Sequence, residues 1–148
     1  MTKTYYEQLS DLNVDFFERA KISLLDPLGL YLANDVKWIK TNQNWNYLKF
    51  PVVIGGKGQP ILLLHGFDSS FLEFRRIYQS LKRNFQVIIP DLLGFGFSPR
   101  CAVNEYNPSK IISYLVDLLK TLKIKDNLKI IGASMGGSTA LKLAFEIP

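Results

Sequence analysis

The stretch LKIIGASMGG, residues 128–137, decides how this chain folds. Its first four residues are mostly apolar and predict a short strand buried inside a sheet. A Gly-x-Ser-x-Gly turn centred on Ser134 follows, and then a segment of helical pattern. In so tight a turn, side chains two residues either side of the serine would collide, so Gly132 and Gly136 are needed there, and Gly137 would let the helix approach the sheet. A serine presented between a strand and a helix in this way is typical of a nucleophile.

Two further apolar runs end in motifs upstream of this turn. Residues 61–64 lead into His65-Gly66-Phe67, and residues 87–89 lead into residues 91–98, DLLGFGFS. Ser70 and Glu73 match a capping box before the first helical segment. The predicted order of elements is strand 61–64, helix 71–81, strand 87–89, helix 109–122, strand 128–131 and helix 135–146. This alternation predicts a parallel sheet with right-handed crossovers, whose active site lies at the carboxyl ends of the strands.

The chain divides into two parts by pattern. Residues 1–46 carry no catalytic pattern and are expected to form an N-terminal helical extension and a loop that holds both tryptophans. We expect the helix to pack on the domain rather than on a membrane, because its polar face mixes both charge signs. Residues 47–148 form the second part, which opens with a strand over 47–54 that Pro51 pushes toward an edge of the sheet.

Composition excludes several classes of function. The formal net charge is +5, but the lysines are scattered rather than gathered in a stripe, so no nucleic-acid partner is expected. The single cysteine, Cys101, cannot form an intrachain disulfide and fits a reducing compartment. No stretch is long and apolar enough for stable membrane insertion, and no secretory signal is evident, so a cytoplasmic location is expected.

The three motifs together resemble the α/β-hydrolase fold family, in the branch with a serine nucleophile and a Gly-x-Ser-Met-Gly-Gly turn. The resemblance covers about residues 47–148. It implies an α/β fold, the N-terminal half of a sheet of mainly parallel strands with flanking helices. It also implies a small-molecule substrate, no cofactor and no metal.

The resemblance assigns roles residue by residue. Ser134 matches the nucleophile, and the backbone N–H groups of Met135 and Phe67 match the oxyanion hole, which stabilises negative charge on the reacting oxygen. In the family the first and third of the strands above are neighbours, which would bring Phe67 beside Ser134. His65 and Asp91 match supporting positions rather than the base and the acid.

In the family, the acid and the histidine of the triad follow the serine, yet only 14 residues follow Ser134 here. We therefore expect an N-terminal part of a serine hydrolase, inactive alone, whose partner could be its own C-terminal half. The alternative is a non-catalytic remnant or a ligand-binding module on the same scaffold. A serine at this turn argues against dehalogenase and epoxide-hydrolase chemistry, because those relatives use an aspartate. Esters, thioesters and carbon–carbon bonds all remain open as substrates.

Overall fold

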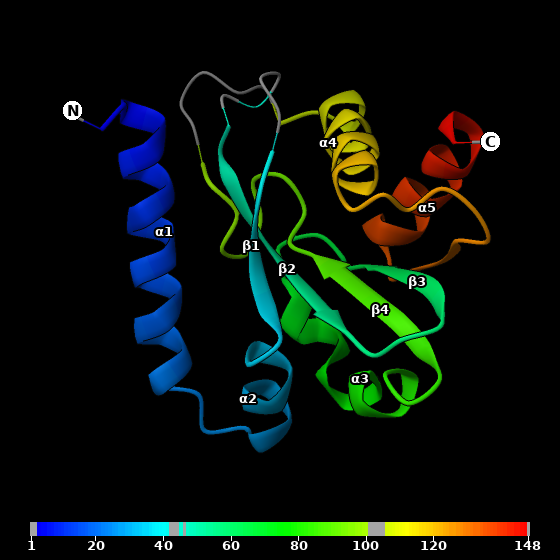
Figure 1. The fold of residues 1–148 in the computed structure, drawn as a ribbon, viewed down its shortest axis with the longest axis horizontal. Coiled ribbons are helices and arrows are strands. Elements are labelled where there is room, and N and C mark those ends of the chain that lie inside the picture. Colours follow the sequence, from blue (N-terminus) through cyan, green and yellow to red (C-terminus); the bar gives the residue numbers. More distant parts are fainter. Residues whose placement is uncertain (1–2, 42–44, 46, 101–105, 148) are drawn as a thin grey trace.

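The computed structural model describes residues 3–41, 45, 47–100 and 106–147, so Cys101 lies outside the described residues. Helices and strands alternate along most of the chain (Figure 1). In chain order they are α1 (Tyr5–Ile22), α2 (Pro27–Ala33), β1 (Val36–Lys40), β2 (Lys49–Gly55), β3 (Gln59–Leu64), the 3-10 helix η2 (Phe71–Phe74), α3 (Arg75–Leu81), β4 (Phe85–Pro90), α4 (Pro108–Thr121), β5 (Lys129–Gly132) and α5 (Met135–Glu146).

The five strands form one mixed sheet in the order β1-β2-β4-β3-β5. β3 is parallel to both of its neighbours, β4 and β5, whereas β1 pairs antiparallel with β2 and β2 pairs antiparallel with β4. The predicted parallel arrangement of the three apolar runs is confirmed. The expected burial of the third run is not, because β5 lies at the edge of the sheet with Lys129 and Ile131 exposed. The first and third runs are indeed neighbours, with the second on the far side of the first. The carboxyl ends of β3, β4 and β5 therefore meet at one edge of the sheet.

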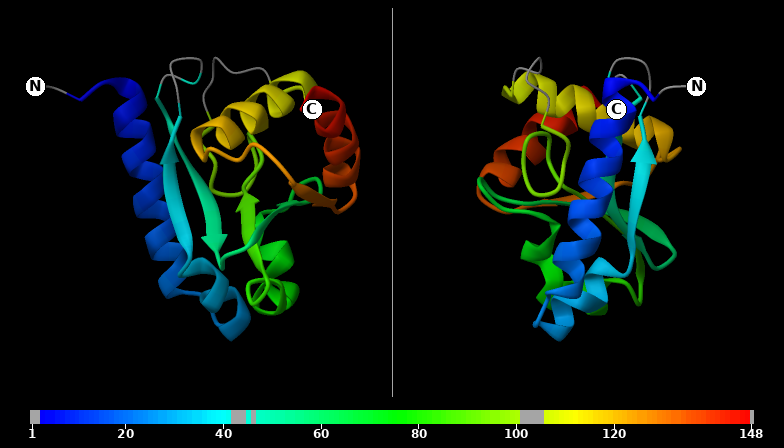
Figure 2. Two further views of the ribbon diagram at one scale, coloured as in Figure 1. Left: turned by 45° about the vertical axis from the view of Figure 1, so that its right-hand side comes forward. Right: turned by 90° about the vertical axis from the view of Figure 1, so that its left-hand side faces the viewer.

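Both faces of the sheet are covered, because successive side chains of a strand point to opposite faces. On β3, Leu62 and Leu64 belong to the core under α4 and α5, whereas Ile61 and Leu63 belong to the core under α1, α2 and α3. Figure 2 shows α4 and α5 together on one side of the sheet and α1 alongside β1 on the other. Strands buried on both faces need apolar residues at every position, which explains the unbroken apolar runs in the sequence.

The N-terminal helix α1 packs on the domain, as expected. Thr4 and Glu7 form a capping box at its start, and Phe17 is buried with its ring edge-on to Phe71 and Trp38. Within the described ranges, no helix is both long enough and apolar enough to cross a bilayer.

Two expectations about the first strands are wrong. The stretch around Trp38, expected as a loop, is strand β1, in which Trp38 lies opposite Pro51 of β2. The sequence places β2 at an edge because of Pro51, but β2 lies between β1 and β4. The β2–β4 pairing begins only at Val52 opposite Pro90, and the Pro51 carbonyl accepts a hydrogen bond from the Asp91 N–H just beyond β4. Pro51 therefore sits past the end of the β2–β4 pairing, where its missing N–H costs little.

Candidate active site

Ser134 occupies a strained turn between a strand and a helix. β5 ends at Gly132, α5 begins at Met135, and Ser134 between them has φ 51° and ψ −117° with an exposed side chain. Such a backbone conformation costs a non-glycine residue about 1–3 kcal/mol and persists only when the surrounding structure enforces it. The predicted turn is confirmed, and it places the Ser134 hydroxyl at the carboxyl end of the sheet.

The glycines around the serine are enforced by backbone contacts. A β-carbon on Gly132 would lie 2.1 Å from the Gly136 carbonyl oxygen, and one on Gly136 would lie 2.0 Å from the Leu64 carbonyl oxygen. Gly137 differs, because a β-carbon there would meet the Gly132 oxygen at 3.5 Å, an ordinary contact. The packing therefore requires two of the three glycines, and the expectation that Gly137 is needed for helix–sheet approach is not supported by this contact.

The loop after β3 lies directly against the serine. The Ala133 N–H donates to the Leu64 carbonyl at 3.0 Å, which joins the turn to the end of β3. A β-carbon on Gly66 would sit 3.4 Å from the Ser134 β-carbon. Residues 67–68 of the loop are exposed, and the ring of Phe67 packs edge-on against Phe95 at 5.5 Å.

His65 holds this loop from inside the core. Its side chain is fully buried, its Nε2 accepts the Leu92 N–H at 2.9 Å, and its Nδ1 therefore carries the proton and donates to the Gly66 carbonyl at 2.8 Å. In a trans peptide the C=O and the following N–H point in opposite directions. With the Gly66 carbonyl held toward the imidazole, the Phe67 N–H points away from it.

The same contacts prevent His65 from acting as a general base. Burial lowers the pKa of His65, so the ring is neutral, and both ring nitrogens are already used. A base needs a free nitrogen within hydrogen-bond reach of the proton that it removes. These contacts agree with the role that the sequence suggests for His65, which is to hold the loop after β3 rather than to act as the base.

Asp91 braces the loops from the end of β4. Its carboxylate, fully buried, accepts the Phe71 N–H at 2.6 Å and the Phe97 N–H at 2.7 Å, and its backbone carbonyl accepts the Ser98 hydroxyl. Burial raises the pKa of Asp91 to about 7, although the two backbone N–H groups oppose this rise. A buried carboxylate whose two oxygens each accept a backbone N–H supports the loops.

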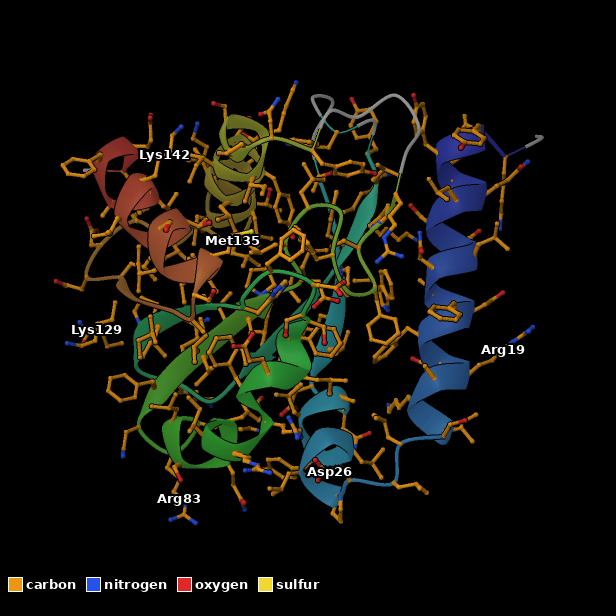
Figure 3. All side chains as sticks on the ribbon, turned by 180° about the vertical axis from the view of Figure 1, so that it is seen from behind. Arg19, Asp26, Arg83, Lys129, Met135 and Lys142 are labelled. Carbon is orange, nitrogen blue, oxygen red and sulfur yellow. The ribbon has the colours of Figure 1, made fainter. Side chains whose placement is uncertain are left out.

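Met135 supplies the first N–H of α5, and the first four N–H groups of a helix have no acceptor within it. They favour negative charge nearby. Figure 3 labels Met135 at the start of α5, and its side chain packs into the core that α4 and α5 share. The Met135 amide thus lies directly after Ser134, at the start of α5.

Glu73 is a site residue that the sequence does not single out. Its pattern predicts a capping box with Ser70, but neither contact of the box forms: the Ser70 hydroxyl accepts the Leu72 N–H at 3.3 Å instead of the Glu73 N–H, and the Glu73 carboxylate accepts the Gly66 N–H at 2.8 Å. The segment opens as the 3-10 helix η2, whose tighter winding turns the carboxylate toward the loop.

A family model described as alpha/beta hydrolase fold matches residues 59–148. The chain belongs to the α/β-hydrolase fold family. Its match covers β3 to α5, the part that builds the serine turn and both loops beside it.

Curated relatives of this α/β-hydrolase chain include several hydrolases. It is 37% identical over 89 residues to the 2-hydroxy-6-oxo-6-(2'-aminophenyl)hexa-2,4-dienoic acid hydrolase of Metapseudomonas resinovorans, covering 58% of this chain and 30% of that protein. It is 36% identical over 91 residues to Lipase 1 of Psychrobacter immobilis, covering 62% of this chain and 28% of the lipase. The chain thus spans about a third of the length of the curated relatives that it matches.

Solved structures agree with this fold. A mutant form of the meta-cleavage product hydrolase CumD from Pseudomonas fluorescens superposes with a TM-score of 0.67 at 26% identity, covering 74% of this chain and 40% of that one. A putative acyltransferase from Salmonella enterica gives the same TM-score at 29% identity, over 75% and 37% of the two chains.

Proposed function

We propose that Ser134 is the nucleophile of a serine hydrolase that acts on an ester, thioester or carbon–carbon bond of a small organic substrate. The observation that carries the proposal is the strained, exposed Ser134 at the carboxyl end of β5, with the loop after β3 packed against it. Strain of this kind gathers at functional sites, and a serine that served only as a turn residue would gain nothing from it.

The reaction would proceed by acyl transfer. The Ser134 oxygen attacks the substrate carbonyl carbon, its proton passes to a base, and the carbonyl oxygen gains negative charge within reach of the Met135 and Phe67 N–H groups. The leaving group departs with a proton, and water then releases the acyl group from the serine. His65 and Asp91 are committed to the loops, so the base would come from another part of the complete gene product.

Ester hydrolysis by the complete gene product tests the proposal, with p-nitrophenyl butyrate as substrate. Ser134→Ala should lower kcat by about 10³-fold or more, because the acyl-enzyme cannot form. Ser138→Ala, an exposed serine one turn later on α5, is the matched control and should leave kcat unchanged. Activity of Ser134→Ala equal to that of the wild-type protein would contradict the proposal, and hydrolysis no faster than the uncatalysed background in all three proteins would favour a ligand-binding module.

A further inference from the structure

Side chains hold the two consecutive peptide groups around Gly66. The Glu73 carboxylate accepts the Gly66 N–H, which belongs to the peptide between residues 65 and 66. The His65 imidazole donates to the Gly66 carbonyl, which belongs to the peptide between residues 66 and 67. Both peptides lie outside β3, so no neighbouring strand fixes them.

We propose that Glu73 is a positioning residue for the oxyanion hole: its carboxylate fixes the loop after β3 so that the Phe67 N–H faces the oxygen of the carbonyl that Ser134 attacks. This inference rests on the proposed function of Ser134. It adds a requirement that neither the serine turn nor the His-Gly motif contains, namely an acceptor from η2.

Glycine makes such a support necessary. Gly66 has no side chain to restrict its backbone, and it packs against Ser134 so closely that a β-carbon there would touch the serine. The carbonyl side of Gly66 is fixed by His65 from the core, but a peptide pinned at one group can still rotate about the other bonds of the glycine. A second hydrogen bond at the N–H removes that freedom, and it also satisfies an amide of a buried residue.

The support itself is rigid. Asp91 accepts the Phe71 N–H at the first residue of η2, and both Phe71 and Phe74 of η2 are buried. Glu73 lies between these two anchors, so its backbone is fixed relative to the end of β4. A connected path of contacts thus runs from Asp91 through η2 and Glu73 to Gly66.

Helix capping does not account for the contact. Ser70 already caps η2 through the Leu72 N–H, and the Glu73 carboxylate is bonded to Gly66 rather than to the Ser70 amide that a capping box requires. Glu7 on α1 offers a direct comparison. Its carboxylate accepts the Thr4 N–H at 2.9 Å within its own helix start, which makes a true box on α1, and α1 lies on the opposite side of the molecule from α5 (Figure 1).

Three variants of the complete gene product test the inference by kinetics. Glu73→Ala removes the acceptor, Glu73→Gln keeps an acceptor oxygen, and Glu7→Ala removes the comparable contact on α1. Loss of a whole oxyanion donor costs about 10²–10³ in rate, so a misdirected donor should lower kcat about tenfold or more in Glu73→Ala. KM should change little, because the donor acts on the transition state, and both other variants should stay within about threefold of wild type.

Amide hydrogen exchange, followed by NMR, gives a readout that does not depend on activity. The Gly66 N–H should be protected in the wild-type protein and in Glu73→Gln, and should exchange at least about tenfold faster in Glu73→Ala. If Glu73→Ala does not fold, Glu73→Leu keeps the side-chain bulk and takes its place. Unchanged kcat together with unchanged Gly66 exchange would overturn the inference. Failure of Ser134 as the nucleophile would show separately, as full activity of Ser134→Ala with the Gly66 exchange result intact.

Discussion

Replacing Gly136 with alanine adds one methyl group at the most crowded point of the serine turn. The new β-carbon would lie 2.0 Å from the Leu64 carbonyl oxygen and 2.7 Å from the His65 carbonyl oxygen. Both oxygens belong to the backbone, so no side chain can rotate to relieve the overlap, and α5 and the end of β3 must move apart by about 1 Å. Overpacking of this kind costs about 1–3 kcal/mol, occasionally more, and offsets the roughly 1 kcal/mol that alanine gains over glycine within a helix.

Gly137→Ala is the matched control, because it changes the next residue of the same helix and its β-carbon finds an ordinary 3.5 Å contact. It should leave stability unchanged or raise it by about 0.5–1 kcal/mol. Because both variants share the gain of alanine over glycine, urea unfolding of the complete gene product, followed by tryptophan fluorescence, should separate them by about 1–3 kcal/mol. A shift of about 1 Å at the reacting group should also lower activity about 10²-fold in Gly136→Ala alone. Equal stability and activity of the two variants would refute the packing argument.

Three further outcomes are expected. The raised pKa of Asp91, about 7, means that the folded state keeps a proton that the unfolded chain has lost above about pH 4. Its contribution to stability is therefore present below about pH 4 and is lost as the pH rises to about 7, by up to about 1.4 kcal/mol per pH unit. When the free energy of unfolding in urea is measured against pH, Asp91→Asn should no longer show this loss, and an unchanged pH profile would assign the loss to other groups. The 148-residue chain by itself should not react with a fluorophosphonate, because its single histidine is committed to the loop after β3, and labelling at the rate of active serine hydrolases would reveal a base within these residues. Apolar surface is exposed on β5 and α5, at Ile131, Leu141 and Phe145, so the isolated chain should self-associate in size-exclusion chromatography. Phe145→Lys should shift its elution toward the monomer, and elution of the wild-type chain as a monomer would contradict this prediction.

The parts of the fold that the sequence could predict are those set by local pattern. Apolar runs such as 61–64 become strands because burial on both faces requires apolar residues at every position. The serine turn follows from the steric demands at Gly132 and Gly136, and the order of the parallel strands follows from the family resemblance.

The sequence is less informative where tertiary contacts decide the outcome. β1 has lysines that break its apolar pattern, and it forms because β2 offers it a complete partner. Proline is expected in edge strands because it has no N–H to donate to a neighbouring strand. In β2 the pairing with β4 begins only after Pro51, so the absent N–H leaves no hydrogen bond of that pairing unmade. Glu73 matches a local cap, and only the folded loop reveals its acceptor role for Gly66, seven residues earlier.

The identity of the covalently modified residue tests the central proposal most directly. The complete gene product should be treated with a fluorophosphonate, and mass spectrometry of the intact protein and of its peptides should locate the adduct. The proposed mechanism predicts one adduct per chain, on Ser134, and ester hydrolysis that falls in parallel with the extent of labelling. An active enzyme that carries the adduct on another residue, or that loses no activity when Ser134 is labelled, would contradict it.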